Sequence, residues 1–282
     1  MTDDTATELT LQQAAAHLGV HYMTVYRYVR LGMLPAHKDG ATWRVTREDL
    51  AQFDLGRGTG PTTRTAGHRL SAPWAARLEA RLLAGDGSGA WSVVEAALAS
   101  GAGMEQLYLD IIAPSMVSIG NLWATGEIDV GEEHRASGVV MRILSRLGPR
   151  FTRPGRNRGS VLLAGAPGEQ HSLPVSMLAN LLTGDGYAVI ELGADVPSSS
   201  LARMAGTVQR LLVVGVSVTT PGLEPNVREM VAAVHQAVPD VPILVGGGAI
   251  GDEEHARTLG ADGWAGNARD ARILIDALAG NA

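Results

Sequence analysis

Residues 161–174 read Val-Leu-Leu-Ala-Gly-Ala-Pro-Gly-Glu-Gln-His-Ser-Leu-Pro, an apolar run followed by a polar loop. The apolar run has the length of a buried strand, and Pro174 suits the first turn of a following helix. Glu169 and His171 therefore lie on a strand-to-helix loop. Ligands of open α/β sheets bind at the carboxyl ends of the strands, where such loops begin.

Further apolar runs continue this pattern and alternate with segments of helical periodicity. They span residues 188–192, 211–216, 241–245 and, more weakly, 261–264. Strands that alternate with helices predict a parallel α/β sheet. We therefore expect a Rossmann-like, flavodoxin-like domain over residues 151–282.

The polar residues at the ends of these runs form a candidate ligand site. Glu169 is placed to accept a hydrogen bond from the His171 imidazole and to fix its tautomer. Ser217 and Thr219 follow the third run, and Gly246-Gly247 follows the fourth, where glycine permits close backbone approach. An isolated His on a loop is more often a surface or packing residue, but these coincidences favour a metal ligand. The glycines of residues 164–168 match neither dinucleotide-binding nor Walker spacing.

Residues 71–150 show apolar stripes at helical spacing, separated by Gly-rich breaks, which predicts a small helical bundle. The stripes cover residues 74–83, 91–99, 104–123 and 132–147. Taken alone, Trp123 reads as a core aromatic residue and Glu133-His134 as a helix start.

Residues 1–55 predict a small unit of the helix-turn-helix type, followed by a hairpin-like stretch. Thr10 suits a helix N-cap, a second helix is expected at 23–31, and a hairpin turn is expected at Asp39-Gly40. A further helix should start at Thr46. Residues 56–70 are rich in Gly, Thr and Arg and read as a linker. The side chains expected to face DNA are Tyr22, Thr24, Arg27, Arg30 and Arg44.

The composition excludes several kinds of site and indicates a globular protein without a membrane span. The 282 residues contain no Cys, which excludes disulfides and thiolate metal sites, and the net charge is −6. No apolar run reaches 18 residues, so a cytoplasmic protein without a membrane span is expected. Residues 1–65 carry seven basic and seven acidic side chains, so one copy should bind DNA weakly and several copies are needed.

Three groups of residues resemble known families. Glu169-x-His171, Ser217-x-Thr219 and Gly246-Gly247 resemble the acidic-x-His-x-x-Gly, Ser-x-Leu/Thr and Gly-Gly motifs of the cobalamin-binding fold. Residues 11–45 resemble the winged helix-turn-helix of MerR- and excisionase-type DNA binders. The Trp123-x9-Glu133-His134 pattern is similar to that of cobalamin-dependent photoreceptor repressors of the CarH/LitR type, whose domain order also matches.

This resemblance implies a role for each motif. His171 would be the lower axial cobalt ligand, with the displaced tail of the cofactor beside Ser217, Thr219 and Gly246-Gly247. Trp123 would pack on the 5′-deoxyadenosyl group of adenosylcobalamin, with Val130, Glu133 and His134 nearby. The implied protein is a homo-oligomer, a dimer or tetramer, that binds operator DNA and releases it in light. No catalytic residue is implied, and the protein is not expected to be an enzyme.

Two positions depart from the family pattern. Pro174 replaces the last Gly of the loop motif, and Ala124 stands where the best-known members carry a His that ligates cobalt after illumination. The light-state ligand could then be water or His134, or the site could hold a different upper group or a second chromophore. A light-independent corrinoid sensor is one alternative function. A corrinoid methyl carrier is another, although such a carrier has no use for a helix-turn-helix.

Overall fold

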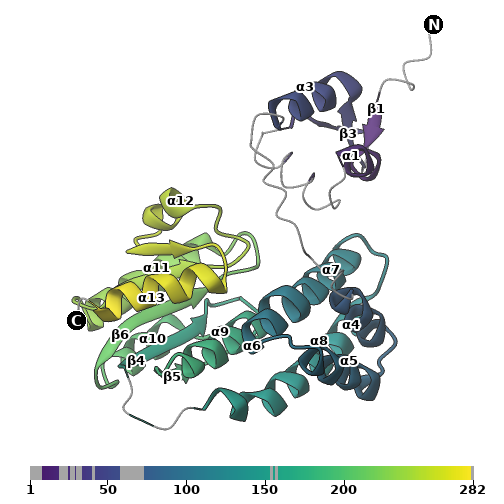
Figure 1. Ribbon diagram of the computed structural model, residues 1–282. Coiled ribbons are helices and arrows are strands. Elements are labelled where there is room, and N and C mark those ends of the chain that lie inside the picture. The colour runs from purple at the N-terminus through teal and green to yellow at the C-terminus, as the bar shows by residue number, and fades with distance from the viewer. Residues whose placement is uncertain are drawn as a thin grey trace, which may run out of the picture. The chain divides into compact units, whose positions relative to one another are not determined.

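The computed structural model describes residues 8–18, 25, 29, 34–39, 42–57, 73–152, 155 and 158–280. The chain divides into two compact units, Met1–Ser71 and Ala72–Ala282 (Figure 1). Each unit is described by itself below.

The first unit combines a three-stranded antiparallel sheet with helices. Its elements are β1 (Glu8–Thr10), α1 (Leu11–Leu18), β2 (His37–Asp39), β3 (Thr42–Thr46) and α3 (Arg47–Arg57), with strand order β1-β3-β2. Thr10 caps α1 as expected: its hydroxyl accepts the Gln13 N–H, and the Gln13 side chain accepts the Thr10 N–H. Asp39 pairs with Thr42, which confirms the hairpin.

The remaining helices of this unit show one agreement and one difference. Of the expected helix 23–31, Val25 and Val29 are described; both are helical and both are buried. The helix α3 continues to Arg57, two residues into the expected linker. Helix ends are set by local hydrogen bonding and commonly differ by one or two residues from a boundary read off the sequence.

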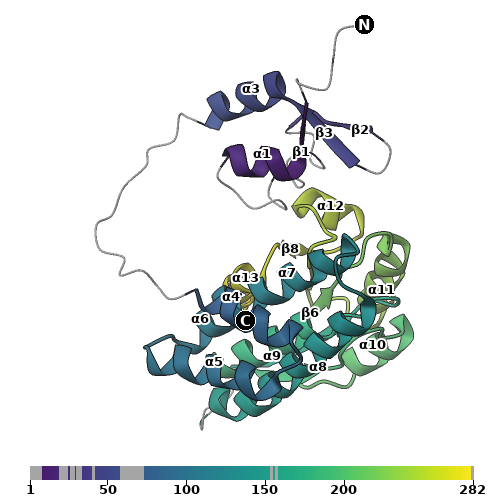
Figure 2. The same cartoon turned by 90° about the vertical axis from the view of Figure 1, so that its right-hand side faces the viewer.

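The second unit begins with a helical bundle, which faces the viewer in Figure 2. Its long helices are α4 (Trp74–Leu83), α5 (Gly87–Ala99), α7 (Ala113–Ala124) and α8 (Val130–Leu147). Asp129 caps α8 in a capping box: its side chain accepts the Glu132 N–H at 2.9 Å, and Glu132 accepts the Asp129 N–H at 3.0 Å.

The expected apolar stretch 104–123 forms one helical path with a local widening. It comprises α6 (Met104–Gln106), a π-helix (Leu107–Ile112) and α7. Pro114 lies in the first turn of α7, lacks an N–H, and would crowd the carbonyl one turn before it in a regular helix. We attribute the π-helix to this proline, because a wider turn relieves that contact.

By length and composition Met104–Ala124 could also cross a membrane. However, its Leu107, Ile112 and Ile119 are fully buried in the core of the bundle. Packing within the protein therefore accounts for these buried side chains, whereas Val117 and Trp123 of the same stretch are exposed.

The α/β domain follows and has the expected five parallel strands in the order β5-β4-β6-β7-β8. The strands are β4 (Ser160–Gly165), β5 (Ala188–Glu191), β6 (Leu211–Ser217), β7 (Ile243–Gly246) and β8 (Gly263–Ala265). This order places the change of winding direction between β4 and β6. A doubly wound sheet of this order binds ligands outside the carboxyl ends of the strands at that point.

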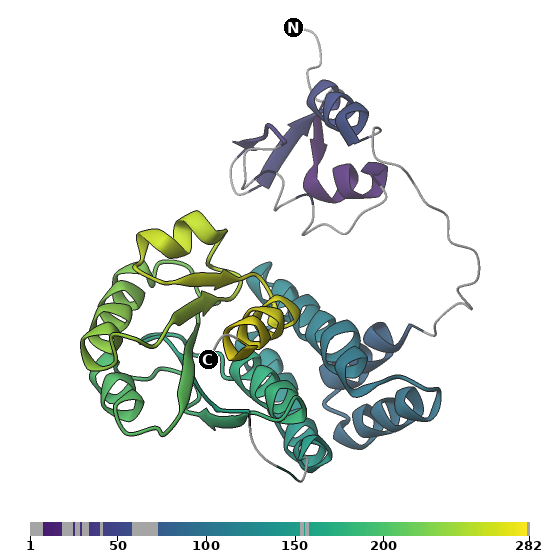
Figure 3. The ribbon, with the colours of Figure 1, turned by 60° about the vertical axis from the view of Figure 1, so that its left-hand side comes forward.

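Helices cover both faces of the sheet (Figure 3). They are α9 (Leu173–Gly184), α10 (Ser198–Ala205), α11 (Glu224–Ala237), α12 (Glu253–Thr258) and α13 (Ala268–Gly280). Successive strand residues alternate between the two cores: Val161 packs with α9 and α13, whereas Leu162 packs with α10 and α11. Because both faces are buried, the strands read as continuous apolar runs rather than alternating ones.

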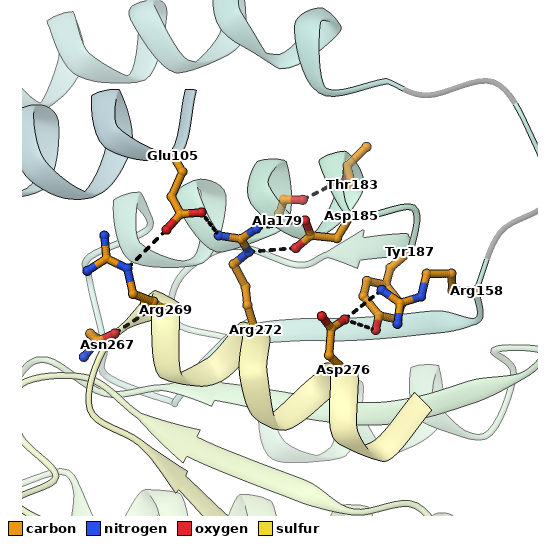
Figure 4. Close-up of polar contacts among 10 residues, drawn as sticks. All are labelled: Glu105, Arg158, Ala179, Thr183, Asp185, Tyr187, Asn267, Arg269, Arg272 and Asp276. Atoms are coloured by element: carbon orange, nitrogen blue, oxygen red, sulfur yellow. Dashed lines mark hydrogen bonds and ion pairs between the residues drawn. The ribbon is translucent and has the colours of Figure 1, made fainter. Parts of the chain in front are cut away.

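The helical bundle packs directly against α9 and α13. Met177 and Leu181 of α9 belong to the buried core of the bundle. The Tyr108 hydroxyl accepts a hydrogen bond from Asn180 Nδ2 at 3.0 Å. On the same side, Arg272 of α13 extends toward Glu105 of α6 (Figure 4).

Candidate functional site

The loop between β4 and α9 carries Glu169 and His171. Gly168 takes a positive φ of 88°, and the Glu169 N–H closes a turn on the Ala166 carbonyl at 2.9 Å. Pro174 lies in the first turn of α9, where its missing N–H has no helical partner to lose. The loop therefore ends in a helix start that supports the segment containing His171.

Glu169 is fully buried and accepts hydrogen bonds from three directions. Its Oε1 accepts from His171 N at 2.9 Å and from His171 Nδ1 at 2.5 Å. Its Oε2 accepts from the Thr219 N–H, from Thr219 Oγ1 at 2.9 Å and from the Thr220 N–H at 2.9 Å. Thr220 Oγ1 adds a longer contact to Oε1, at 3.2 Å. A buried carboxylate is stable only with such partners, so this loop and the one after β6 are held together through Glu169.

These contacts set the charges of the pair. Burial alone would raise the pKa of Glu169, but the hydrogen bonds from His171, Thr219 and Thr220 outweigh it and lower the pKa. The hydrogen bond to Glu169 raises the pKa of His171. The negative charge of Glu133, on helix α8 of the bundle, raises it further. Glu133 is thus close enough to act on His171 electrostatically.

The imidazole of His171 suits a metal that is already held by another group. Glu169 and the Thr219 hydroxyl, 3.0 Å away, both engage Nδ1, which leaves Nε2 for a ligand. The side chain is 48% exposed, so Nε2 is accessible. Among the described residues no three His, Asp or Glu side chains are grouped as a complete metal site. One protein ligand fits a metal whose other positions come from a macrocycle.

The third and fourth strands end beside this loop. Ser217, the last residue of β6, is paired in register with Gly246, the last residue of β7, and its carbonyl accepts the Ala166 N–H at 3.2 Å. A Cβ on Gly246 would overlap the carbonyl oxygen of Ala265, and one on Gly247 would overlap that of Val218. Gly247 also has a φ of 109°. The two glycines are therefore required by the close approach of the protein's own backbone.

The bundle contributes a second group of residues around the turn between α7 and α8. Trp123, near the end of α7, is 45% exposed, and Val130, the first residue of α8, is 51% exposed. Both are therefore surface residues and not core, contrary to the plain alternative for Trp123. Glu133 Oε1 accepts from the Ser137 hydroxyl at 2.6 Å, and Glu133 Oε2 lies 2.7 Å from His134 Nδ1. The His134 side chain is 74% exposed.

The structure describes one of the five residues that are expected to face DNA. Arg44 lies in β3, opposite Thr10 of β1 and His37 of β2. Tyr22, Thr24, Arg27 and Arg30 lie outside the described residues.

Two residues that bond to the loop containing His171 were not predicted from the sequence. Thr220 donates its N–H to Glu169, as Thr219 does. Asp195, in the loop between β5 and α10, accepts the Gly168 N–H at 2.7 Å. The signal for Thr220 was its place beside Thr219 at the end of a strand. Asp195 also follows a strand, but the sequence does not show that its loop meets the His171 loop.

Comparisons with known proteins agree with this geometry. Family models described as B12 binding domains match residues 74–147 and 159–274, and a helix-turn-helix domain model matches residues 8–53. A corrinoid protein of Desulfitobacterium hafniense is 27% identical over 168 residues, 57% of this chain and 77% of that protein. The transcriptional repressor CarH of Myxococcus xanthus is 32% identical over 142 residues, 50% of this chain and 46% of the repressor. That match spans less than two thirds of the repressor.

A solved structure shares the fold. The monomethylamine corrinoid protein of Methanosarcina barkeri superposes with a TM-score of 0.62 at 17% identity, covering 71% of this chain and 96% of that one. At this identity the likeness concerns the fold alone. The chain thus carries an N-terminal helix-turn-helix domain, a helical B12-binding domain and an α/β B12-binding domain, a combination that supports a cobalamin-binding transcriptional regulator.

Proposed function

We propose that this chain is a light-responsive, adenosylcobalamin-dependent transcriptional repressor that binds operator DNA as a cofactor-controlled homo-oligomer. One observation carries the proposal: a helix-turn-helix domain stands on the same chain as the two B12-binding domains. The likeness of this chain to a transcriptional repressor supports the same conclusion.

In this proposal His171 would bind the cobalt of the cofactor, and Glu169 would orient the imidazole. Nδ1 stays hydrogen-bonded to Glu169, so Nε2 is the nitrogen that binds. Ser217, Thr219, Gly246 and Gly247 would border the displaced tail of the cofactor, at the carboxyl ends of β6 and β7. When bound, adenosylcobalamin supplies a cobalt–carbon bond that visible light breaks.

In this proposal, the helical bundle is the part of the chain that responds to the state of the bound cofactor. A ligand shifts an assembly equilibrium only through contacts that differ between two states. Trp123 and Val130 are large apolar side chains left exposed at the α7–α8 turn, which suits them to cover an upper ligand. Glu133 and His134 flank the same turn, and the charge of Glu133 reaches His171.

The N-terminal unit would bind the operator through Tyr22, Thr24, Arg27 and Arg30, with Arg44 on the wing. Its basic and acidic side chains balance, so each copy contributes little nonspecific attraction. Several copies held in one oligomer would raise the effective concentration at the operator. A change of oligomeric state is then enough to control DNA binding.

Ala124 cannot supply a cobalt ligand after illumination, because its side chain is a methyl group. Without a His at this position, His134 or water would be the group that binds the cobalt in place of the adenosyl group in our proposal. His134 is 74% exposed, and its Nδ1 is paired with Glu133, so its Nε2 is the available nitrogen. A His134→Ala variant that keeps the spectrum of the illuminated wild type would exclude His134 from that position.

Corrinoid carriage is the second candidate, because the corrinoid protein of Desulfitobacterium hafniense matches over 77% of its length. Such a carrier needs the bundle and the α/β domain but not the helix-turn-helix. DNA binding that depends on cobalamin would exclude this reading. A regulator that senses cobalamin without light is distinguished from the proposed photoreceptor by comparing DNA binding in the dark and after illumination.

The deciding experiment records absorption, elution volume and operator binding with adenosylcobalamin, in the dark and after green light. We expect spectral change, change in size and loss of DNA to occur together. Stable binding without light-driven change in size would point to a dark sensor or a carrier. His171→Ala should weaken cofactor retention or change the spectrum. His235→Ala, on α11 and bonded to the Gly260 carbonyl, is its matched control.

A further inference from the structure

Asp195 has an uncommon backbone conformation. Its φ is 50°, and among the described residues only Arg210, with a φ of 53°, shares positive φ without being glycine. Asp and Asn tolerate this region best, because their short polar side chains can bond to nearby backbone. Here the carboxylate bonds instead to another loop, 27 residues away in sequence. A non-glycine residue persists in such a conformation where the surrounding contacts fix it.

The contacts of Asp195 enclose Glu169. Asp195 Oδ1 accepts the Gly168 N–H at 2.7 Å, and the Asp195 N–H donates to the Glu169 carbonyl at 2.8 Å. One residue therefore binds the Pro167–Gly168 peptide, one residue before Glu169, and the Glu169–Gln170 peptide that follows it. Two backbone bonds extend the junction toward β4: Gly165 N to Gly193 O at 2.7 Å, and Val196 N to Gly165 O at 3.1 Å.

The position of the Glu169 backbone decides whether its carboxylate meets its donors. The donors come from His171 and from Thr219 and Thr220, on different loops. Hydrogen bonds weaken steeply with lost distance and angle, so a small shift of Glu169 would loosen several of them together. The most important of these hydrogen bonds joins His171 Nδ1 to Glu169, because it sets the orientation of the ring and leaves Nε2 free to bind a ligand.

We propose that Asp195 is the positioning residue for the lower ligand: it holds Glu169 in place and thereby presents His171 Nε2 to a macrocycle-bound metal. The proposal rests on the proposed function for the identity of the ligand. It does not rest on it for the orientation of His171, which is a property of the chain itself. Asp195 is exposed and lies in the loop after β5, so its own carboxylate remains in contact with solvent.

Three substitutions distinguish the effect of the Asp195 carboxylate from the effect of its backbone conformation. Asp195→Gly keeps the positive φ at no steric cost and removes the acceptor. Asp195→Asn keeps an oxygen acceptor and tolerates the same φ. Arg210→Gly is the matched control, because it makes the same replacement at the other positive-φ position.

The first readout uses the full chain without cofactor. Nitrogen-15 NMR of the eight histidines reports which ring nitrogen of His171 carries the proton, with His171→Ala assigning the signal. At a pH above the raised pKa of His171, we expect one neutral tautomer, protonated at Nδ1, in the wild type and in Asp195→Asn. Asp195→Gly should show a mixed or exchanging ring, and Arg210→Gly should match the wild type.

The second readout is binding of hydroxocobalamin, followed by its absorption spectrum. Loss of an outer contact that orients a metal ligand costs about 10–100-fold in affinity, so Asp195→Gly should weaken binding by about tenfold or more. Asp195→Asn should stay within about threefold of the wild type on the same reasoning. If Asp195→Gly does not fold, Asp195→Ser tests the same contact, since its hydroxyl is too short to reach Gly168 from the same backbone.

The outcomes separate the two proposals. An unchanged His171 signal and unchanged hydroxocobalamin affinity in Asp195→Gly would overturn the role of Asp195. Equal loss in Asp195→Gly and Arg210→Gly would overturn it too, because a general backbone effect would then explain both. If the wild type binds no cobalamin, the proposed function fails, while the NMR comparison still decides whether Asp195 orients His171.

Discussion

Glu105 and Arg272 lie 167 residues apart in the chain and form an ion pair, with Arg272 Nη1 2.6 Å from Glu105 Oε2 (Figure 4). The same guanidinium binds Asp185 in a fork: Nε lies 2.7 Å from Oδ2 and Nη2 lies 2.8 Å from Oδ1. Arg269 adds a bond to Glu105 at 3.1 Å. One arginine thus joins the bundle to two helices of the α/β domain, and it is only 20% exposed.

Removing the charge of Glu105 should loosen this junction. Glu105→Gln leaves Arg272 bound to Asp185 but weakens its bond to the bundle. Because Glu105 is partly exposed, we expect a loss of about 1 kcal/mol. For a unit of this size that lowers the melting temperature by roughly 2–4 °C, measured by calorimetry at pH 7. Glu253→Gln is the control, since the Glu253–Arg257 pair is 67% exposed on both sides. Equal shifts for the two variants would contradict the prediction.

The same pair should show a defined pH dependence. Hydrogen bonds from Arg272 and Arg269 lower the pKa of Glu105 below its ordinary value of 4.5. A carboxyl group with a lowered pKa contributes stability above its unfolded pKa and loses it as the pH falls through its folded pKa. The stability difference between wild type and Glu105→Gln should therefore be constant near neutral pH and shrink below about pH 4.5. A difference that grows on acidification, in denaturant titrations at several pH values, would exclude the ion pair as its source.

The adjacent glycines after β7 allow a matched test of backbone packing. Gly247→Ala would place a Cβ against the Val218 carbonyl at a positive φ, whereas a Cβ on Gly248 meets nothing within 4 Å. We expect Gly247→Ala to destabilise the fold by at least about 2 kcal/mol. Gly248→Ala should stay within about 0.5 kcal/mol of the wild type.

Cofactor binding by the folded Gly248→Ala variant adds a second result. A weaker affinity with unchanged stability would place the cofactor beside Gly248. If chemical denaturation shows equal stability for both alanine variants, the close approach at Gly247 is not a constraint in solution.

The sequence predicted local relationships well. The apolar runs identified all five strands, because strands buried on both faces carry no polar interruption. The Thr10 cap and the Glu169–His171 hydrogen bond could be predicted because each joins groups that are close in sequence, where the local backbone fixes their distance.

Contacts between segments that are distant in the chain could not be predicted from the sequence. Glu105 and Arg272 look like ordinary charged surface residues until the fold places α6 against α13. Asp195 was missed for the same reason, since only the meeting of two loops gives its carboxylate a partner. The π-helix was missed because Pro114 in an apolar stripe also fits a simple kink.

DNA recognition can be tested separately from cofactor uptake. Arg27→Ala should weaken operator binding by about 1–3 kcal/mol if the side chain contacts a base edge. The spectrum and affinity of cobalamin should not change. Arg203→Ala removes the same charge from an exposed position on α10, outside the N-terminal unit, and is the control. Electrophoretic mobility shifts at fixed salt would contradict the assignment if both variants lost affinity equally.

Trp123 offers the sharpest test of the upper side of the site. Because its side chain is 45% exposed, Trp123→Ala should change the stability of the cofactor-free protein by no more than about 1 kcal/mol. If Trp123 packs on an adenosyl group, the variant should lose affinity for adenosylcobalamin but not for hydroxocobalamin, which lacks that group. Burial of an aromatic ring against a planar group contributes roughly 1–2 kcal/mol, so a loss of about tenfold is expected.

Val117→Ala is the control for this test, since Val117 lies on the same helix and is 61% exposed. It should bind both corrinoids as the wild type does. Equal losses for the two corrinoids in Trp123→Ala would show that the tryptophan supports the bundle and not the adenosyl group. The next residues to examine would then be Glu133 and His134 on α8, because they follow the same α7–α8 turn and the charge of Glu133 raises the pKa of His171.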